Sequence, residues 1–257
     1  MLMTKTVEVK SKDELATMRR AGAVVADILQ LLKATVKPGM STGEIDSICR
    51  AELKKRDAKP AFLNYHGFPG VICISINSEV VHGIPRDSRK LAAGDIVGLD
   101  FGCVIDGWFA DSAITVGVGD ITPEAQRLID VTRESLEKGI AAVKAGARIG
   151  DIGAAVQGHA EAAGYSVVRE FVGHGIGRAL HEEPPIPNYG KAGAGQRLKA
   201  GMTIAIEPMV NMGGPEVATL GDGWTAVTKD GKLSAHFEHT VAVTESGAVI
   251  LTLPTGA

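Results

Sequence analysis

The chain has 257 residues, 45% of them hydrophobic and 22% charged, which is typical of a globular protein and excludes a disordered chain. With 27 basic and 30 acidic residues, its net charge of −3 creates no positive field that would hold a nucleic acid. Three cysteines, no apolar signal segment at the amino terminus and no membrane-spanning stretch predict a cytoplasmic protein with reduced thiols and no membrane partner.

Helices and strands can be predicted in chain order. Apolar residues at three- and four-residue spacing predict a helix over 12–34 that Pro38-Gly39 ends. A second helix begins at Ser41 or Thr42, where a hydroxyl can cap it, and extends to about residue 55. Later helices are expected from Pro123 to Val143 and over 150–163. Apolar, β-branched stretches predict strands over 71–76, 95–105, 108–118, 165–173, 202–210, 234–244 and 249–253.

A weak internal repeat accompanies this order of elements. Residues 36–45 align with residues 143–152 at an offset of 107, and each segment follows one helix and begins the next. The alternative is a chance match between two glycine-rich helix junctions. Because no Pro- or Ser-rich linker separates the halves, the sequence favours one domain over 1–257, with related halves at about 12–120 and 121–250.

Acidic residues lie in apolar strand sequence without basic partners. No Lys or Arg occurs from Leu91 to Gln126, yet Asp100 and Asp111 lie within that segment. Asp106-Gly107 is a two-residue hairpin signal, which would pair Ile105 with Trp108 and place Asp111 opposite Gly102. Asp100 is then a diagonal neighbour of Asp111 on the same face, about 7–8 Å away, near enough for both carboxylates to share an ion.

The second half shows the same pattern. Glu207 and Glu238 also lie in apolar strands, and no Lys or Arg occurs between residues 199 and 229. Burying an unpaired carboxylate costs several kcal/mol, so each acid needs a cation or a raised pKa unless it faces solvent. A divalent metal ion is the expected cation. His174, between two glycines, and His181 are the candidate imidazoles, although a single histidine is more often structural. Carboxylates with one imidazole suit Mn, Fe, Co or Zn.

Together these motifs resemble the type I methionine aminopeptidases of metallopeptidase family M24. The matching segments extend in order over about residues 60–243: YHGFPGVICISIN with VVHGIP, DIVGLDFGCVIDGWFADSA, GHGIGRALHEEP, GMTIAIEPMVN and GWTAVTKDGKLSAHFEHT. The resemblance implies an α+β pita-bread (creatinase/aminopeptidase) fold. In that fold a curved antiparallel sheet, covered by helices, forms two pseudo-symmetric halves.

The resemblance also implies a site with two divalent ions, for which Co, Mn, Fe, Zn and Ni are candidates. Asp100 would bind one ion, His174 and Glu207 the other, and Asp111 and Glu238 would bridge both. As catalytic residues, Glu207 would accept a proton, His82 would contact the substrate near its scissile amide, and His181 would stabilise the carbonyl oxygen. The methionine pocket maps onto Tyr65, Phe68, Cys73 and Trp224.

Three further points follow from the resemblance. Phe62 stands where a cysteine is common and Leu180 where an aromatic residue is common, which leaves the shape of the pocket open. Some relatives hold a monovalent cation near the positions of Asn77 and Ser234. The implied activity is removal of the initiator Met from nascent chains whose second residue is small, by a monomer that associates transiently with ribosomes.

Two other functions are compatible with a fold of this kind. An aminopeptidase P or prolidase has the same fold, but usually carries an additional amino-terminal domain and different histidine motifs. A non-catalytic binding protein on this scaffold would typically lack metal ligands, and here all five are present.

Overall fold

The computed structural model describes residues 7–256, which form four α-helices, one 3-10 turn and fifteen strands. The helices are α1 (Lys12–Thr35), α2 (Thr42–Lys55), α3 (Pro123–Ala141) and α4 (Ile149–Ala162), and the 3-10 turn η1 is Tyr65–Gly67. The strands are β1 (Lys59–Pro60), β2 (Ile72–Ile76), β3 (Glu79–Val81), β4 (Ile96–Ile105), β5 (Trp108–Gly117), β6 (Ser166–Val167), β7 (Gly173–Gly175), β8 (Glu182–Ile186), β9 (Thr203–Ile206), β10 (Met209–Asn211), β11 (Val217–Thr219), β12 (Ala226–Thr228), β13 (Ser234–His236), β14 (Glu238–Val243) and β15 (Ala248–Ile250).

All four predicted helices are present, and local signals explain where they begin. The side chain of Ser41 caps α2, and Glu44 bonds back to the Ser41 backbone N–H at 2.6 Å, which completes a capping box. Thr122 caps α3, with Pro123 in the first turn. Three predicted strands are interrupted instead of continuous. Residues 168–172 separate β6 from β7 within the stretch predicted as one strand over 165–173. Pro208, which has no N–H for a ladder bond, separates β9 from β10, and Phe237 separates β13 from β14.

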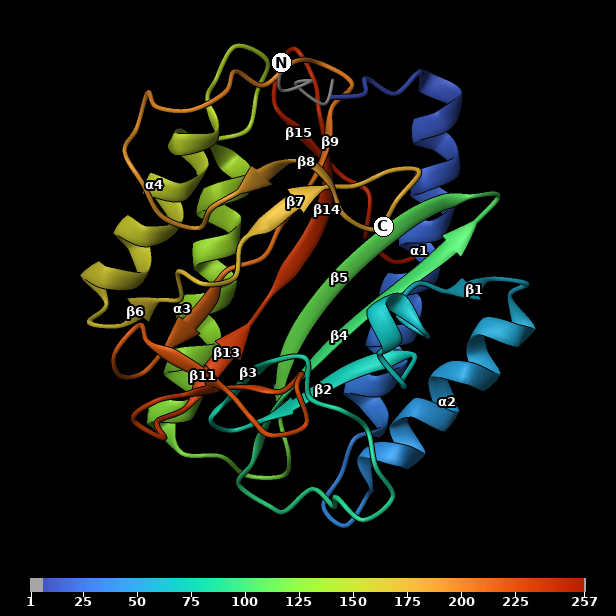
Figure 1. The fold of residues 1–257 in the computed structure, drawn as a ribbon, viewed down its shortest axis with the longest axis vertical. Coiled ribbons are helices and arrows are strands. Elements are labelled where there is room, and N and C mark those ends of the chain that lie inside the picture. Colours follow the sequence, from blue (N-terminus) through green and yellow to red (C-terminus); the bar gives the residue numbers. More distant parts are fainter. Residues whose placement is uncertain (1–6, 257) are drawn as a thin grey trace.

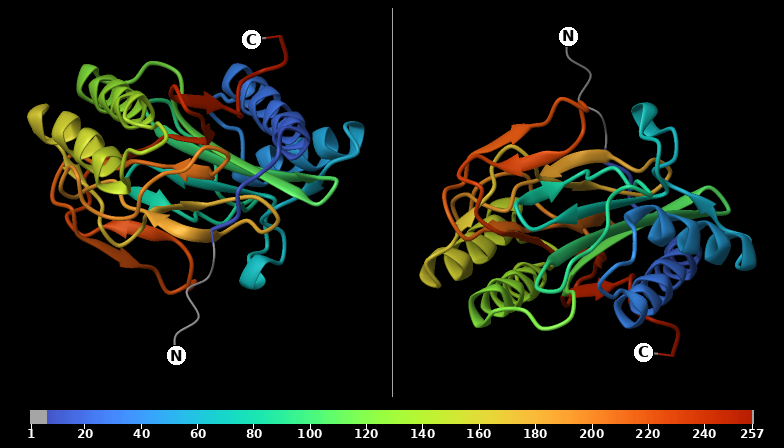
Figure 2. Two further views of the ribbon diagram at one scale, coloured as in Figure 1. Left: turned by 90° about the horizontal axis from the view of Figure 1, so that it is seen from above. Right: turned by 90° about the horizontal axis from the view of Figure 1, so that it is seen from below.

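The main sheet is antiparallel, with the order β1-β4-β5-β14-β9-β7-β8, while β2 pairs with β4 and β15 with β14. In the view of Figure 1, α1 and α2 lie towards one lateral edge of the long strands, and α3 and α4 lie towards the other. Figure 2 shows the sheet curving, with the helices on one side of it. The sheet is thus covered by helices on one face and free to form a site on the other.

The hairpin of β4 and β5 has the predicted register. Ten residue pairs run from Ile96 opposite Gly117 to Ile105 opposite Trp108 without a shift. Asp106 and Gly107 have φ angles of 50° and 77°, as a two-residue turn that matches the twist of the strands requires. Asp111 therefore lies opposite Gly102, and the prediction for this hairpin is confirmed.

The two halves repeat the same backbone contacts at the offset found in the sequence. Gly39 N donates to Leu91 O at 2.7 Å, and at 107 residues further on Gly146 N donates to Leu198 O at 2.9 Å. The bridge between Ser41 and Lys90 likewise recurs between Arg148 and Arg197. A chance match between helix junctions does not account for these recurring contacts, and the fold consists of two pseudo-symmetric halves.

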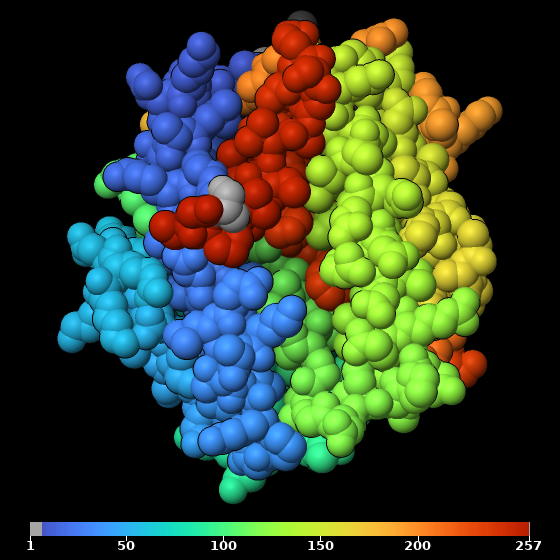
Figure 3. All heavy atoms as spheres, turned by 180° about the vertical axis from the view of Figure 1, so that it is seen from behind, coloured from blue at the N-terminus to red at the C-terminus, as the bar shows by residue number. Residues whose placement is uncertain are grey.

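A solvent-accessible cavity lies at the rear of the molecule. Figure 3 shows α1 and α3 on this side, with the last described segment of the chain between them. A cavity of about 560 Å³ opens there, floored by β5 and lined by Ser112 and His239. Among residues 7–256, no helix is both long and apolar enough to span a membrane.

Candidate metal centre

The hairpin of β4 and β5 brings the first two acids to the open face of the sheet. Asp100 and Asp111 occupy diagonal positions of the register, as predicted. Asp111 is only 4% exposed, and the Oδ1 atoms of both residues are buried without a hydrogen-bond partner among the described residues. The backbone N–H of Asp111 donates to Thr240 Oγ1 at 3.1 Å, which ties the hairpin to β14 of the other half.

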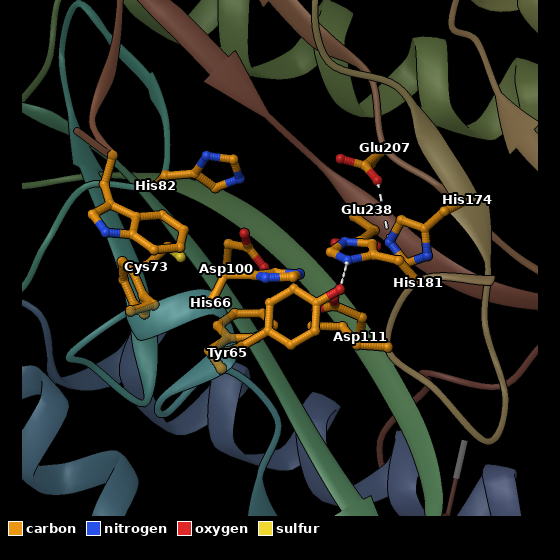
Figure 4. Close-up of a pocket in the computed structure, with 14 residues that line it drawn as sticks. Tyr65, His66, Cys73, His82, Asp100, Asp111, His174, His181, Glu207 and Glu238 are labelled. Carbon is orange, nitrogen blue, oxygen red and sulfur yellow. Dashed lines mark hydrogen bonds and ion pairs between the residues drawn. The ribbon is translucent and has the colours of Figure 1, made fainter. Parts of the chain in front are cut away.

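The second half supplies the other acids. Glu207 directly follows β9, and Glu238 begins β14, where it lies opposite Ala113 of β5. Glu238 is 2% exposed, and its Oε1 is also buried without a partner in the described chain. Figure 4 shows these carboxylates and those of the hairpin facing a common cavity. Four acids from two pseudo-symmetric halves therefore converge on one point.

His174 completes this group as a neutral imidazole. Its Nδ1–H donates to Gly175 O at 2.8 Å, so Nε2 carries a free lone pair, and it lies 3.5 Å from Glu207 Oε1. Burial lowers the pKa of His174 to about 3, with a smaller contribution from His181. One atom each from Asp111, His174 and Glu238 lie within 4.8 Å of one another, as required of metal ligands.

Burial raises the pKa of every carboxyl in the group. For Asp111 burial raises the pKa from 3.8 to about 7. For Asp100, Glu207 and Glu238 burial is again the main cause, and the negative charge of Asp111 raises each pKa further. No Lys or Arg of the described chain lines the cavity to offset these charges. Unpartnered carboxylate oxygens and one free imidazole nitrogen fit divalent cations.

Every predicted catalytic, metal-binding and methionine-pocket residue lines a cavity of about 280 Å³ next to these acids. One end is apolar, because the Phe68 and Trp224 rings meet edge to face at 5.2 Å beside the buried Cys73. His82 has a φ of 62° and packs edge to face against Trp224 at 6.2 Å. Phe62 and Leu180, the two departures from the family pattern, also line the cavity.

The hydroxyl of Tyr65 and the ring of His181 meet beside the acids. Tyr65 Oη lies 2.6 Å from His181 Nδ1, and the His181 ring packs edge to face against His174 at 4.2 Å. Burial lowers the pKa of His181, and so does the charge of His66. Both effects favour the neutral form of the His181 ring.

Outside the cavity, Asn77 and Ser234 also lie together, since Ser234 N donates to Asn77 O at 2.9 Å.

Several residues around the site are not among those predicted from the sequence. His66 lines the cavity, and its position next to Tyr65 in the YHGF segment could have indicated that it belongs to the site. His236 is buried 3.9 Å from Glu207 Oε2, and its spacing of two residues from Glu238 could have indicated a shared strand face. The buried Lys10 binds Glu182 at 2.8 Å, next to His181, and a separation of 172 residues left no local signal for that pair.

Comparisons with known proteins agree with this geometry. The model of metallopeptidase family M24 matches residues 16–245. The chain is 52% identical to methionine aminopeptidase A of Synechocystis over 98% of this chain and 99% of the relative. It is 51% identical to methionine aminopeptidase 1 of Bacillus subtilis over 95% and 98% of the two chains.

Solved structures give the same result. A methionine aminopeptidase from Thermotoga maritima superposes with a TM-score of 0.95 at 44% identity, covering 96% of this chain and 100% of that one. Prolidase from Pyrococcus furiosus superposes with a TM-score of 0.76 at 23% identity over 95% of this chain and 65% of its own, a likeness that shows the fold. The chain therefore belongs to metallopeptidase family M24.

Proposed function

We propose that this chain is a methionine aminopeptidase, a metal-dependent hydrolase that removes an amino-terminal Met when the next residue is small. The observation that carries the proposal is one cavity with two chemically distinct ends. One end holds four carboxylates, of which Asp111 and Glu238 are buried, and a neutral imidazole, and the other is lined by aromatic rings and Cys73. An apolar pocket of this kind suits the unbranched, polarisable side chain of Met. Identities of 44 to 52% to named methionine aminopeptidases over nearly the whole chain support it further.

The acids and His174 would hold two divalent ions. In this proposal Asp100 would hold one ion, His174 and Glu207 would hold the other, and Asp111 and Glu238 would be shared by both. Divalent ions bound there supply Lewis acidity, which activates water near neutral pH and polarises a carbonyl group. Co, Mn, Fe, Zn and Ni remain candidates, because carboxylate and imidazole donors accept each of them.

The remaining roles belong to the chain's own side chains. Glu207 would accept the proton of the attacking water. His181 stabilises the negative charge that develops on the carbonyl oxygen. His82 lies across the cavity from His174 (Figure 4) and contacts the substrate near the scissile amide. Tyr65, Phe68, Cys73 and Trp224 enclose the Met side chain.

The biological setting is part of the same proposal. The chain would act as one domain, with halves at about 12–120 and 121–250, because each half contributes two of the acids. It would act as a cytoplasmic monomer on the amino termini of nascent polypeptides, in transient association with ribosomes. A monovalent cation would bind near Asn77 and Ser234, where Asn77 has a φ of 56°.

A metal-titrated peptidase assay tests the proposal. The metal-free protein should be inactive, and adding Co or Mn should restore cleavage of Met-Ala-Ser, with little cleavage of Met-Leu-Ser. Cleavage of Ala-Pro and Gly-Pro peptides instead would assign the chain to the proline-specific branch of the fold. Full activity in the presence of a chelator, or comparable turnover of Met-Ala-Ser and Met-Leu-Ser, would contradict the proposal.

A further inference from the structure

Tyr65 contributes to the cavity in two ways that can be separated. Its ring forms part of the wall, while its hydroxyl reaches His181, a residue that lies 116 positions further along the chain. The Oη–Nδ1 distance of 2.6 Å is short for a hydrogen bond that involves a nitrogen atom. The contact therefore joins the wall of the cavity to the histidine beside the acids.

The backbone of Tyr65 is held firmly. Its N–H donates to Phe62 O at 2.9 Å, and its carbonyl accepts from Phe68 N at 3.0 Å. The flanking residues Asn64 and His66 adopt positive φ angles of 63° and 47°, which form a tight turn. The ring of Tyr65 also packs edge to face against His66 at 4.5 Å. The position of the hydroxyl is thus set by the turn and does not depend on a bound substrate.

The segment that carries His181 is held independently. The backbone N–H of Phe109 donates to Gly177 O at 2.8 Å, which fixes the segment to β5. Glu182 accepts from the N–H groups of Arg178 and Ala179 and binds the buried Lys10. Two separately fixed segments therefore bring the hydroxyl and the ring together.

The direction of the hydrogen bond follows from the chemistry of its partners. A phenol is a good donor and a weak acceptor, whereas an unprotonated imidazole nitrogen is a strong acceptor. Burial raises the pKa of Tyr65, so its hydroxyl keeps its proton near pH 7. When Tyr65 donates to Nδ1, the proton of a neutral imidazole must reside on Nε2.

We propose that Tyr65 is a positioning residue whose hydroxyl fixes the tautomer of His181, so that Nε2–H donates to the substrate's carbonyl oxygen. Without the hydroxyl, part of the population would carry its proton on Nδ1 and present a lone pair to the developing oxyanion. The proposal rests on the role proposed above for His181. It assigns the hydroxyl of Tyr65 a function that is separate from that of the ring.

The test uses Tyr65→Phe, which keeps the ring and removes only the hydroxyl. We expect kcat to fall about tenfold, with KM for a Met-Ala peptide and metal content unchanged. Tyr165→Phe, the same change at a tyrosine that does not line the cavity, is the matched control and should leave kcat unchanged. In a His181→Ala background, Tyr65→Phe should cause no further loss.

A spectroscopic measurement tests the tautomer without activity. In ¹⁵N spectra of the metal-free protein, the His181 signals, assigned by their absence in His181→Ala, should show a bare Nδ1 and a protonated Nε2. Tyr65→Phe should shift both signals towards a mixture of tautomers. A protonated Nδ1 in the unaltered protein, or losses that multiply in the double variant, would overturn this proposal alone. Full kcat in His181→Ala would overturn the role of His181 and this proposal with it.

Discussion

Replacing Asp111 with Asn should make the metal-free protein more stable at alkaline pH, although it removes a proposed metal ligand. Burial raises the pKa of Asp111 from 3.8 to about 7 in the metal-free fold. Between these values the folded state binds a proton that the unfolded state releases, so stability falls as pH rises from about 4 to 7. Each unit of pKa difference corresponds to about 1.4 kcal/mol, so at pH 8 the buried charge costs on the order of 4 kcal/mol.

An amide at this position carries no charge and avoids that cost. It also removes the Coulombic effect of Asp111 on Asp100, Glu207 and Glu238, which acts in the same direction. A protein of this size melts about 2–4 °C higher for each kcal/mol gained. Metal-free Asp111→Asn should therefore melt on the order of 10 °C above the metal-free parent at pH 8.

Thermal denaturation followed by circular dichroism, at pH 5 and pH 8 with and without metal, measures these differences. The advantage should shrink at pH 5, where Asp111 of the parent is protonated. With metal at 100 times its Kd the parent gains about 2.7 kcal/mol, whereas the variant gains less, so the variant's advantage in melting temperature should narrow. Asp106→Asn, in the exposed turn of the same hairpin, is the control and should behave like the parent. Equal melting of the two metal-free proteins at pH 8, or an equal difference at both pH values, would refute the reasoning.

Three further outcomes are expected. His181→Ala should lower kcat far more than it raises KM and leave the metal content unchanged; loss of metal on dialysis would show that His181 is a ligand. Glu182→Gln leaves the ammonium of Lys10, whose side chain is 1% exposed, with only the more distant Glu8 carboxylate at 4.0 Å. The change should lower the free energy of unfolding in urea by about 3 kcal/mol, whereas Lys10→Met should lower it less; the opposite order would contradict the argument. Leu180→Phe narrows the cavity and should raise KM for Met peptides, and steady-state kinetics showing an unchanged KM would place Leu180 outside the substrate's path.

The features predicted best from the sequence are those determined by residues close to one another along the chain. The hairpin register of β4 and β5 followed from two turn residues, Asp106 and Gly107, and the start of α2 followed from Ser41. Placing Asp100 and Asp111 on one face required nothing more. The assignment of individual ligands came instead from resemblance to a family, and it stays a prediction.

Contacts between distant segments could not be predicted in this way. The Tyr65–His181 hydrogen bond joins a turn with positive φ angles to a loop of the other half, and neither segment has a periodic pattern. The binding of Lys10 to Glu182 depends on a pairing that only the finished fold creates. Three predicted strands are interrupted because a hydrophobic pattern cannot locate a bend, although Pro208 marked one of the bends.

The position of β14 has a consequence for how the protein is made. This strand lies between β5 and β9, although it leaves the ribosome after both. Until residues 238–243 have been synthesised, β5 and β9 each present an open edge towards the gap that β14 will fill. Translation at about 5–20 residues per second separates β5 from β14 by on the order of ten seconds. During that interval the two halves have no shared strand, and Glu238, a proposed metal ligand, is missing. The sheet is closed and the proposed metal centre is complete only once β14 is in place.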